Sequence, residues 1–345
     1  MIEFIRGADI SSLPELEYHG GVLRYNGEPV DSLTLLRDTG LNAVRIKVWN
    51  DPGNPDHFPS NQTDALRFNG PEQVIMLARR AHQAGLRIML DFHYSDWWAD
   101  PQKQFLPHAW QGLALPEVCE RLHQFTVDIL QRVQAEGINV AWVQVGNEIS
   151  HGMLWPLGFL PGNWPSLAAL LRAGVAAVRQ AAPEAQVVLH LDAGCDQQLY
   201  RHWFDQAQAL DVSWDCIGLS FYPCWHGSLP HLAQNLQMLA ERYGCPLLVV
   251  ETAYPRQLHL KRNGHWLLQH TGAEPYPATP EGQAQFLGAL ADVLRGVPGG
   301  LGQGIFYWEP ALLPLPDGSR GVWQNATLVD DDGEALPSLM ALGHL

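Results

Sequence analysis

Short runs of apolar residues alternate along the chain with segments whose apolar positions follow the period of a helix. Eight of these runs are rich in β-branched residues and are predicted strands: residues 4–10, 43–49, 87–93, 140–148, 187–192, 216–223, 246–254 and 304–310. Between them, apolar residues recur three and four positions apart, which is typical of a helix with one buried face, as in Val74, Leu77, Ala78 and Ala81. This alternation indicates a parallel sheet with helical connections.

Proline and glycine mark the ends of the predicted helices. Proline stands at or near the first helical position of four segments, and glycine follows the last position of three: residues 70–73, 115–118, 164–167 and 279–282, then Gly85, Gly137 and Gly244. Eight strand–helix units predict an α/β fold, a single (β/α)8 TIM barrel forming one catalytic domain over residues 1–345. The alternative is a doubly wound sheet, but the first strand runs into "GADISSLPE", which lacks the usual glycine-rich phosphate turn.

Charge and composition narrow the possible partners. The chain has 36 acidic and 21 basic residues, a net charge of −15, which argues against a nucleic-acid partner. No uncharged apolar segment is long enough to span a bilayer, and the five scattered cysteines are expected to be reduced. The amino terminus shows no signal peptide, so the sequence as given predicts a cytoplasmic protein, or an extracellular one if a signal was removed. We expect a monomer.

Thirteen tryptophans are an unusually large number for this chain length. Sugar rings stack on aromatic faces because their C–H surfaces are apolar. Tryptophans beside glycine, proline or charged residues are expected to be sugar platforms, namely Trp97, Trp98, Trp155 and Trp308. Those within predicted strands or helices are expected in the core, namely Trp142, Trp203 and Trp214.

Two glutamates stand at the carboxyl ends of predicted strands, where the active sites of such barrels form. Glu148 ends the fourth predicted strand and Glu251 the seventh, so the two carboxyls can face each other across the barrel mouth. Glycoside hydrolysis needs such a pair, about 5–5.5 Å apart in retaining enzymes. We expect Arg45 to keep the pKa of Glu251 low, and burial or repulsion to keep Glu148 protonated near neutral pH.

Several longer segments carry a family resemblance. They are "GADISS" (7–12), "VRIKVWNDP" (44–52), "LDFHYSDWWADPQKQ" (90–104), "VGNEISHGMLWPLG" (145–158), "SFYP" (220–223), "VVETAYP" (249–255) and "FYWEPA" (306–311). Together they resemble the endo-β-1,4-galactanases of glycoside hydrolase family 53, within a clan of retaining (β/α)8 glycosidases. The resemblance implies endo-acting, retaining hydrolysis of β-1,4-galactosidic bonds in galactan or type I arabinogalactan, or in galacto-oligosaccharides.

The resemblance also implies residue roles. Glu148 would be the general acid/base and Glu251 the nucleophile. The implied substrate-binding residues are Arg45, His93, Asn147, Tyr222 and Trp308, with Asn147 on the sugar 2-hydroxyl and Trp308 as the platform. Asp96, Trp97, Trp98 and Asp192 are further candidates at the rim, although turn capping explains either aspartate equally well.

Neither a metal nor another cofactor is expected. Some family members hold calcium after the seventh strand, but here segment 256–275 is basic and has Glu274 as its carboxylate. "VDDDGEALP" (329–337) lacks the later glutamate of a calcium loop and is predicted to be an acidic turn. A metal-dependent hydrolase would need an H-x-H on the first strand. The open alternatives are a related endo-β-mannanase or endo-β-glucanase, or a sugar-binding protein derived from a glycosidase.

Overall fold

Eight parallel strands close into a barrel in the computed structural model, which describes residues 3–52, 67–259, 266–314 and 321–345. Their order around the barrel is β1-β10-β9-β8-β7-β6-β5-β4, and β1 pairs with both β10 and β4. The strands are β1 (Ile5–Asp9), β4 (Ala43–Val48), β5 (Arg87–Phe92), β6 (Trp142–Val145), β7 (Gln186–Leu191), β8 (Cys216–Phe221), β9 (Leu247–Thr252) and β10 (Gly302–Tyr307). The prediction of a (β/α)8 barrel is confirmed, and the doubly wound alternative is wrong because the sheet closes.

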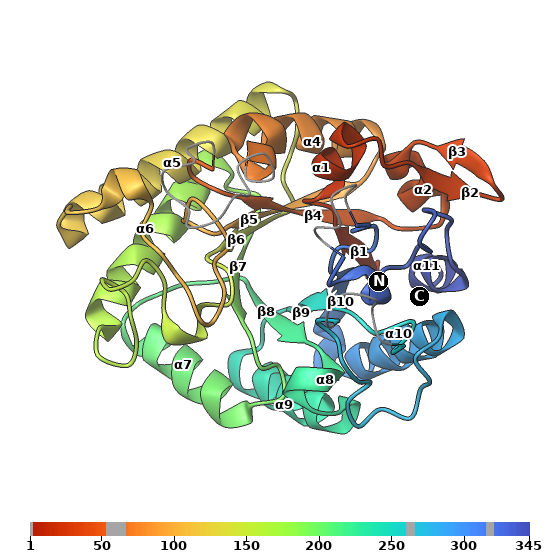
Figure 1. Cartoon of the computed structure of the whole chain (residues 1–345). Coiled ribbons are helices and arrows are strands. Elements are labelled where there is room, and N and C mark those ends of the chain that lie inside the picture. The colour runs from red at the N-terminus through yellow and green to blue at the C-terminus, as the bar shows by residue number, and fades with distance from the viewer. Residues whose placement is uncertain (1–2, 53–66, 260–265, 315–320) are drawn as a thin grey trace.

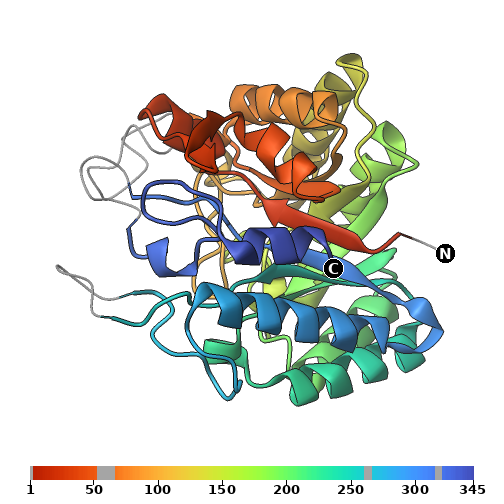
Figure 2. The ribbon, with the colours of Figure 1, turned by 90° about the vertical axis from the view of Figure 1, so that its right-hand side faces the viewer.

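Helices surround the strands on the outside (Figure 1). The long ones are α4 (Pro71–Gln83), α5 (Leu115–Ala135), α6 (Trp164–Ala181), α7 (Gln197–Ala209), α9 (Leu229–Tyr243) and α10 (Pro280–Arg295). Shorter ones are α1 (Leu13–Tyr18), α2 (Ser32–Asp38), α8 (Pro223–His226) and α11 (Pro337–Gly343), and β2 (Leu23–Tyr25) pairs with β3 (Glu28–Val30) between α1 and α2. Seen from the side, the helices run along the barrel and long connecting segments gather at one end (Figure 2). None of the helices in the described ranges is long and apolar enough to cross a bilayer.

Side chains fill the interior of the barrel. One cluster of buried residues joins several strands and includes Met89, Trp142, Val188, Leu248 and Phe306. The rings of Trp142 and Phe306 meet edge to face, with centroids 6.0 Å apart. A Cβ on Gly7 would lie 2.4 Å from the Phe306 ring, so glycine in β1 leaves room for this packing. The core therefore forms a solid floor, and ligands can enter only from the carboxyl ends of the strands.

Two of the three tryptophans predicted in the core are buried there. Trp142 and Trp203 are buried, as predicted. Trp214 is only half-buried, and it packs against Phe204 and Tyr243 at the surface of the helical layer.

Strand ends differ from the sequence prediction at the mouth of the barrel. The fourth predicted strand extends to residue 148, but β6 ends at Val145. Gly146 and Glu148 have positive φ angles of 85° and 48°, and such residues leave the strand conformation. A left-handed backbone is strained for a glutamate and typically persists at functional sites. The turn aims the residues after β6 into the mouth of the barrel.

Candidate active site

A cleft of about 390 Å³ lies at the carboxyl ends of the strands. Both predicted catalytic glutamates line it, together with Arg45, Lys47, His93, Trp98, Asn147, Tyr222, Trp225, Trp308 and Trp323. These side chains lie in or after six different strands, from β4 to β10. The closed barrel therefore brings together residues separated by up to about 280 positions in the sequence.

Arg45 on β4 is the centre of the charged floor. Its guanidinium contacts three carboxylates: Asp9 at 2.8 Å, Asp91 at 2.9 Å and Glu251 at 3.0 Å. Nη2 also donates to Asn147 Oδ1 at 2.7 Å. Burial lowers the pKa of Arg45, but its acidic neighbours outweigh burial and raise it, so Arg45 stays charged. A buried cation with this many acceptors holds Glu251 in one position.

Glu251 is the penultimate residue of β9 and lines the cleft at 7% exposure. Its Oε2 accepts a hydrogen bond of 3.1 Å from the Tyr222 hydroxyl, and Oε1 contacts Arg45. Burial raises the pKa of Glu251 to about 7, with Arg45 and Tyr222 opposing the rise and Asp91 and Asp9 adding to it. The expectation of a low pKa is therefore wrong. Burial of this carboxyl outweighs the opposing effect of Arg45, and the charges of Asp91 and Asp9 add to the rise.

Glu148 follows β6, which is the third strand from β9 around the barrel. Its Oε1 accepts a 2.6 Å hydrogen bond from the Ser220 hydroxyl on β8. Removal from bulk water, the charge of Glu251 and the charge of Asp192 raise its pKa well above the usual value. The direction agrees with the expectation that burial and repulsion raise the pKa of Glu148; protonation of Glu148 near neutral pH stays a prediction. The two carboxyls influence each other electrostatically, as two groups sharing one cleft must.

His93 and Asp91 support Arg45 from the end of β5. His93 Nδ1 accepts from the Ala99 backbone N–H at 3.1 Å and from Trp49 Nε1–H at 3.3 Å. Its Nε2–H therefore donates to Asp91 Oδ2 at 3.0 Å. His93 thus orients the aspartate that binds Arg45, and its ring also lines the cleft.

Asn147 lies between the two glutamates. Its Oδ1 accepts from Arg45, and its Nδ2 donates to the Ala99 carbonyl at 2.8 Å. This amide nitrogen carries a second hydrogen, which remains available to a ligand hydroxyl. Gln104 Nε2 donates to the Asn147 carbonyl at 2.7 Å and fixes the backbone of the turn.

Aromatic rings form the walls of the cleft. Trp98 and Trp308 lie with ring centroids 6.0 Å apart, and Trp323 packs edge to face on Trp308 at 4.5 Å. The Lys47 ammonium lies 3.8 Å from the centroid of Trp98, a cation–π contact that holds this ring. Trp225 is 49% exposed beside Tyr222. A sugar entering the cleft would meet apolar ring faces above a charged floor.

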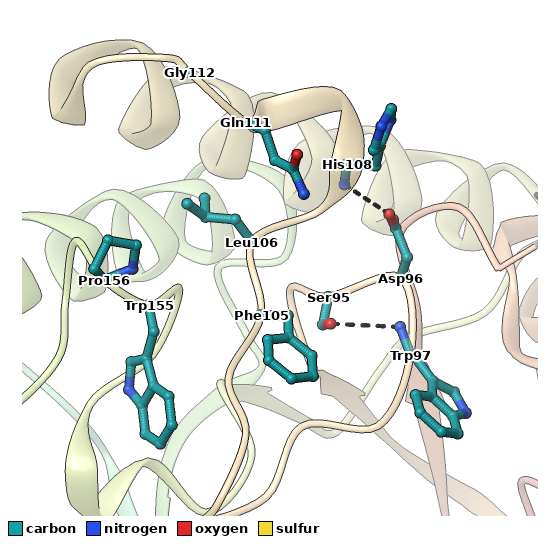
Figure 3. A pocket seen from close by; sticks show the side chains of 10 residues that line it. All are labelled: Ser95, Asp96, Trp97, Phe105, Leu106, His108, Gln111, Gly112, Trp155 and Pro156. Carbon is teal, nitrogen blue, oxygen red and sulfur yellow. Dashed lines mark hydrogen bonds between the residues drawn. The ribbon is translucent and has the colours of Figure 1, made fainter. Parts of the chain in front are cut away.

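Three residues predicted to contact sugar, Asp96, Trp97 and Trp155, line a neighbouring hollow of about 570 Å³ rather than the cleft (Figure 3). Trp97 and Phe105 come from the connection after β5 and Trp155 from the one after β6, and their rings point to the same side of this hollow (Figure 3). Asp96 also lines it, but its carboxylate accepts from the backbone N–H groups of Asp51 at 2.9 Å and His108 at 2.8 Å. Asp96 thus holds two loops together, and substrate binding by Asp96 stays a prediction.

Asp192 lines neither hollow among the described residues. Its carboxylate accepts a hydrogen bond from the Ser150 hydroxyl, and its backbone N–H donates to Ser150 Oγ at 3.2 Å. Through its charge it raises the pKa of Glu148. A role of Asp192 in contacting sugar hydroxyls stays a prediction.

Sequence reasoning missed several residues that the fold brings to the site. Gln144, His190 and Ser220 are buried beneath Asn147 and Glu148. Lys47, Trp225 and Trp323 line the cleft itself. His190 was visible as a polar residue near the end of a predicted strand, and Ser220 stands in the segment "SFYP". Nothing in the local pattern of Trp323 distinguishes it from a core residue.

No cluster of three or more His, Cys, Asp or Glu side chains in the described parts of the chain could hold a metal ion. Segment 256–275, where a calcium site was doubted, includes residues 260–265, which lie outside the described residues. Residues 329–337 form the predicted turn, in which Asp330 Oδ1 accepts from the backbone of Asp332 and Glu334. All five cysteines are free, and Cys216 is the buried one.

A closed parallel barrel with two carboxyls in an aromatic-walled cleft at the strand ends is the arrangement of barrel glycoside hydrolases. Residues 5–342 match Glycosyl hydrolase family 53, and the chain belongs to that family.

Relatives and solved structures resemble this chain over nearly its whole length. An "Uncharacterized protein in bgaB 5'region" of Niallia circulans is 41% identical over 98% of this chain and 93% of its own length. An arabinogalactan endo-beta-1,4-galactanase of Cellvibrio japonicus is 34% identical over 98% of this chain and 90% of its own length. Among solved structures, the Ignisphaera aggregans GH53 catalytic domain superposes with a TM-score of 0.91 at 34% identity, over 99% of this chain and 96% of that one.

Proposed function

We propose that this glycoside hydrolase is an endo-acting β-1,4-galactanase that cleaves galactan by a retaining double displacement. The observation that carries the proposal is the pair of electrostatically coupled carboxyls, Glu148 and Glu251, in one cleft. The Cellvibrio japonicus relative, an arabinogalactan endo-beta-1,4-galactanase, supplies the substrate class. Linear galactan, type I arabinogalactan and galacto-oligosaccharides share the β-1,4-galactosidic bond.

In the first step, Glu251 attacks the anomeric carbon as a carboxylate while Glu148 gives its proton to the departing glycosidic oxygen. The C–O bond to the leaving sugar breaks, and an ester bond forms between the sugar and Glu251. In the second step, Glu148 takes a proton from water, and the water oxygen displaces Glu251 from the same carbon. The enzyme then returns to its starting protonation states.

The surroundings of the two groups support this assignment rather than the reverse. Glu251 is bound by Arg45 and Tyr222, which stabilise a carboxylate. Glu148 has no cation among its described partners, and burial together with the charges of Glu251 and Asp192 raises its pKa well above the usual value. Arg45 and Tyr222 oppose the rise in the pKa of Glu251. These surroundings favour Glu251 as the carboxylate and Glu148 as the proton donor.

The residues around the pair offer a binding site for a galactosyl unit. Trp308 and Trp98 offer stacking faces, and Asn147 offers an amide hydrogen for a sugar hydroxyl. Tyr222 borders the cleft beside Glu251. Sugar binding by Trp97 and Trp155 in the neighbouring hollow stays a prediction, which KM values for galactans of increasing length in Trp155→Ala would test. We propose that the protein works as a monomer without a cofactor.

The experiment is hydrolysis of linear β-1,4-galactan, β-mannan and β-glucan by the native chain and by Glu148→Gln. The native chain is expected to shorten galactan to oligosaccharides and to leave mannan and glucan intact. Glu148→Gln should lose activity on galactan by a factor on the order of 10² to 10⁴, because general acid catalysis contributes this much. Cleavage of mannan or glucan in place of galactan would assign the chain to the related activity. Nearly full galactanase activity in Glu148→Gln would overturn the catalytic pair.

A further inference from the structure

A buried chain of hydrogen bonds leads away from Glu148 into the barrel. Ser220 Oγ donates to Glu148 Oε1 at 2.6 Å, and His190 Nε2 lies 2.8 Å from the same Ser220 oxygen. Both His190 and Ser220 have no exposed surface. Neither side chain lines the cleft, so neither can touch a substrate there.

The contacts of His190 define which ring nitrogen carries its proton. Burial and the charge of Arg45 lower the pKa of His190 well below its usual value, so the ring is neutral and has one N–H. Its Nδ1 accepts from the Glu148 backbone N–H at 3.3 Å, a buried donor that needs a partner. Asn147 Oδ1 is 3.0 Å from Nδ1 but already accepts from Arg45 and Gln144. The proton of His190 is therefore on Nε2.

The direction of the chain follows from this tautomer. His190 Nε2–H donates to Ser220 Oγ, and the Ser220 hydroxyl in turn donates to Glu148 Oε1. A hydroxyl has one hydrogen, and in this arrangement Ser220 cannot rotate it away without losing its bond to Glu148. Oε1 is thereby kept as an acceptor, whatever the protonation state of the carboxyl.

The other oxygen of Glu148 has different surroundings. Oε2 makes no hydrogen bond with the residues that the structure describes, and it is not enclosed, since Glu148 lines the cleft and is partly exposed. When the carboxyl is protonated, Oε1 is occupied by the Ser220 donor, so the proton resides on Oε2.

We infer that His190 and Ser220 are positioning residues that hold the catalytic proton of Glu148 on the oxygen facing the substrate. The inference rests on the proposed function, because it concerns the acid of that reaction. General acid catalysis depends on the proton lying within hydrogen-bond reach of the leaving oxygen. Without Ser220, the proton would distribute over both oxygens and the carboxyl would be free to rotate.

The test compares two substrates on the same protein. Aryl β-glycosides of galactotriose with phenol or 2,4-dinitrophenol as leaving group differ in their need for an acid, because dinitrophenolate departs without a proton. Ser220→Ala is expected to lose on the order of tenfold or more in kcat/KM for the phenyl substrate, the effect of one charge-assisted hydrogen bond. Its loss for the dinitrophenyl substrate should be under about threefold, since the acid is not used in that step. Ser220→Thr keeps a hydroxyl and should restore most of the difference.

The ratio of the two kcat/KM values does not depend on how much of the variant is folded, so poor folding cannot mimic the effect. Equal losses on both substrates, or no loss in Ser220→Ala, would overturn the inference. If the native chain cleaves neither substrate nor galactan, the proposed function itself fails. His190→Gln should resemble Ser220→Ala, because it removes the Nε2–H donor at its present position.

The pH profile gives a second readout. The Ser220 hydrogen bond lowers the pKa of Glu148, so its removal should move the alkaline limb of kcat/KM to higher pH for the phenyl substrate. An unchanged limb in Ser220→Ala would contradict this direct contact. The charged groups that act on Glu148 from other elements are Glu251, Asp192 and Asp100, and those that act on His190 are Arg45, His93 and His226; all stay in place in both variants.

Discussion

Glu251 and Glu309 share most of the features by which a catalytic carboxyl is usually recognised. Each stands at the carboxyl end of a barrel strand: Glu251 near the end of β9 and Glu309 two residues after β10. Each is buried, and each bonds to a cation on β4: Glu251 to Arg45 at 3.0 Å and Glu309 to Lys47 at 3.2 Å. Burial is the largest cause that raises the pKa of each to about 7.

The two carboxyls differ in what lies in front of them. Glu251 lines the 390 Å³ cleft and bonds to the Tyr222 hydroxyl. Glu309 is 2% exposed, bonds to the hydroxyl and backbone N–H of Ser12, and borders a space of about 10 Å³ that holds no more than one water. A perturbed pKa therefore does not identify the reactive carboxyl in this barrel. Access to the cleft identifies it, because a nucleophile must reach the anomeric carbon of the substrate.

The largest expected effect is a loss of activity that distinguishes Glu251 from Glu309. Glu251→Ala is expected to lose at least about 10⁴-fold in kcat, the scale seen when a nucleophile is removed. Azide should restore turnover of an aryl β-glycoside of galactotriose by filling the space and attacking the anomeric carbon, which gives the α-glycosyl azide. Glu309→Ala should neither lose activity to this extent nor form the azide, because its site is closed to the cleft. The product is identified by NMR, and the α-azide appearing with Glu309→Ala would reverse the assignment.

A smaller effect, on the pH dependence of stability, is expected for both Glu251 and Glu309. A carboxyl whose pKa is raised in the folded protein binds its proton more tightly there than in the unfolded chain. Its stabilising contribution is present below pH 4.5 and is lost as pH rises through about 7. The rise from 4.5 to about 7 corresponds to roughly 3 kcal/mol at 1.36 kcal/mol per pH unit.

Urea denaturation at pH 5 and pH 8 measures this loss. In Glu309→Gln, which cannot titrate, the decrease in the free energy of unfolding between the two pH values should be smaller than in the native protein by roughly 2 to 3 kcal/mol. Glu251→Gln should show a similar change, because the pKa of Glu251 is also raised to about 7. A decrease as large as that of the native protein in Glu309→Gln would show that Glu309 does not titrate in this range.

The smallest effect should come from removing one hydroxyl beside each carboxyl. Tyr222 lowers the pKa of Glu251 and Ser12 lowers that of Glu309 through their hydrogen bonds. Because the nucleophile must be ionised, Tyr222→Phe should move the acidic limb of kcat/KM to higher pH. Ser12→Ala is the matched control and should leave that limb in place. A shift in both variants would mean that Glu309 controls the reaction from beneath the cleft.

The barrel was predictable because its signal is repeated eight times. A one-residue error in a single strand does not change the alternation of strands and helices. The catalytic candidates were predictable for a related reason, since charged residues such as Glu148 and Glu251 rarely interrupt buried runs without a role. The ends of the strands were not predictable. Strand β6 stops before Gly146 and Glu148, which adopt positive φ angles, and the residue type of a glutamate does not predict such an angle.

The pattern of the sequence by itself determined the class of fold, the pair of glutamates and the family resemblance, since these depend on local order and residue identity. Only the tertiary structure decided which polar residues share an environment. It placed Ser220 against Glu148 and Lys47 against Trp98, and it separated Trp97 and Trp155 from the cleft. It also enclosed Glu309 while leaving Glu251 open. Distance and burial between segments far apart in the chain set these outcomes, and they follow from barrel closure rather than from any single stretch of sequence.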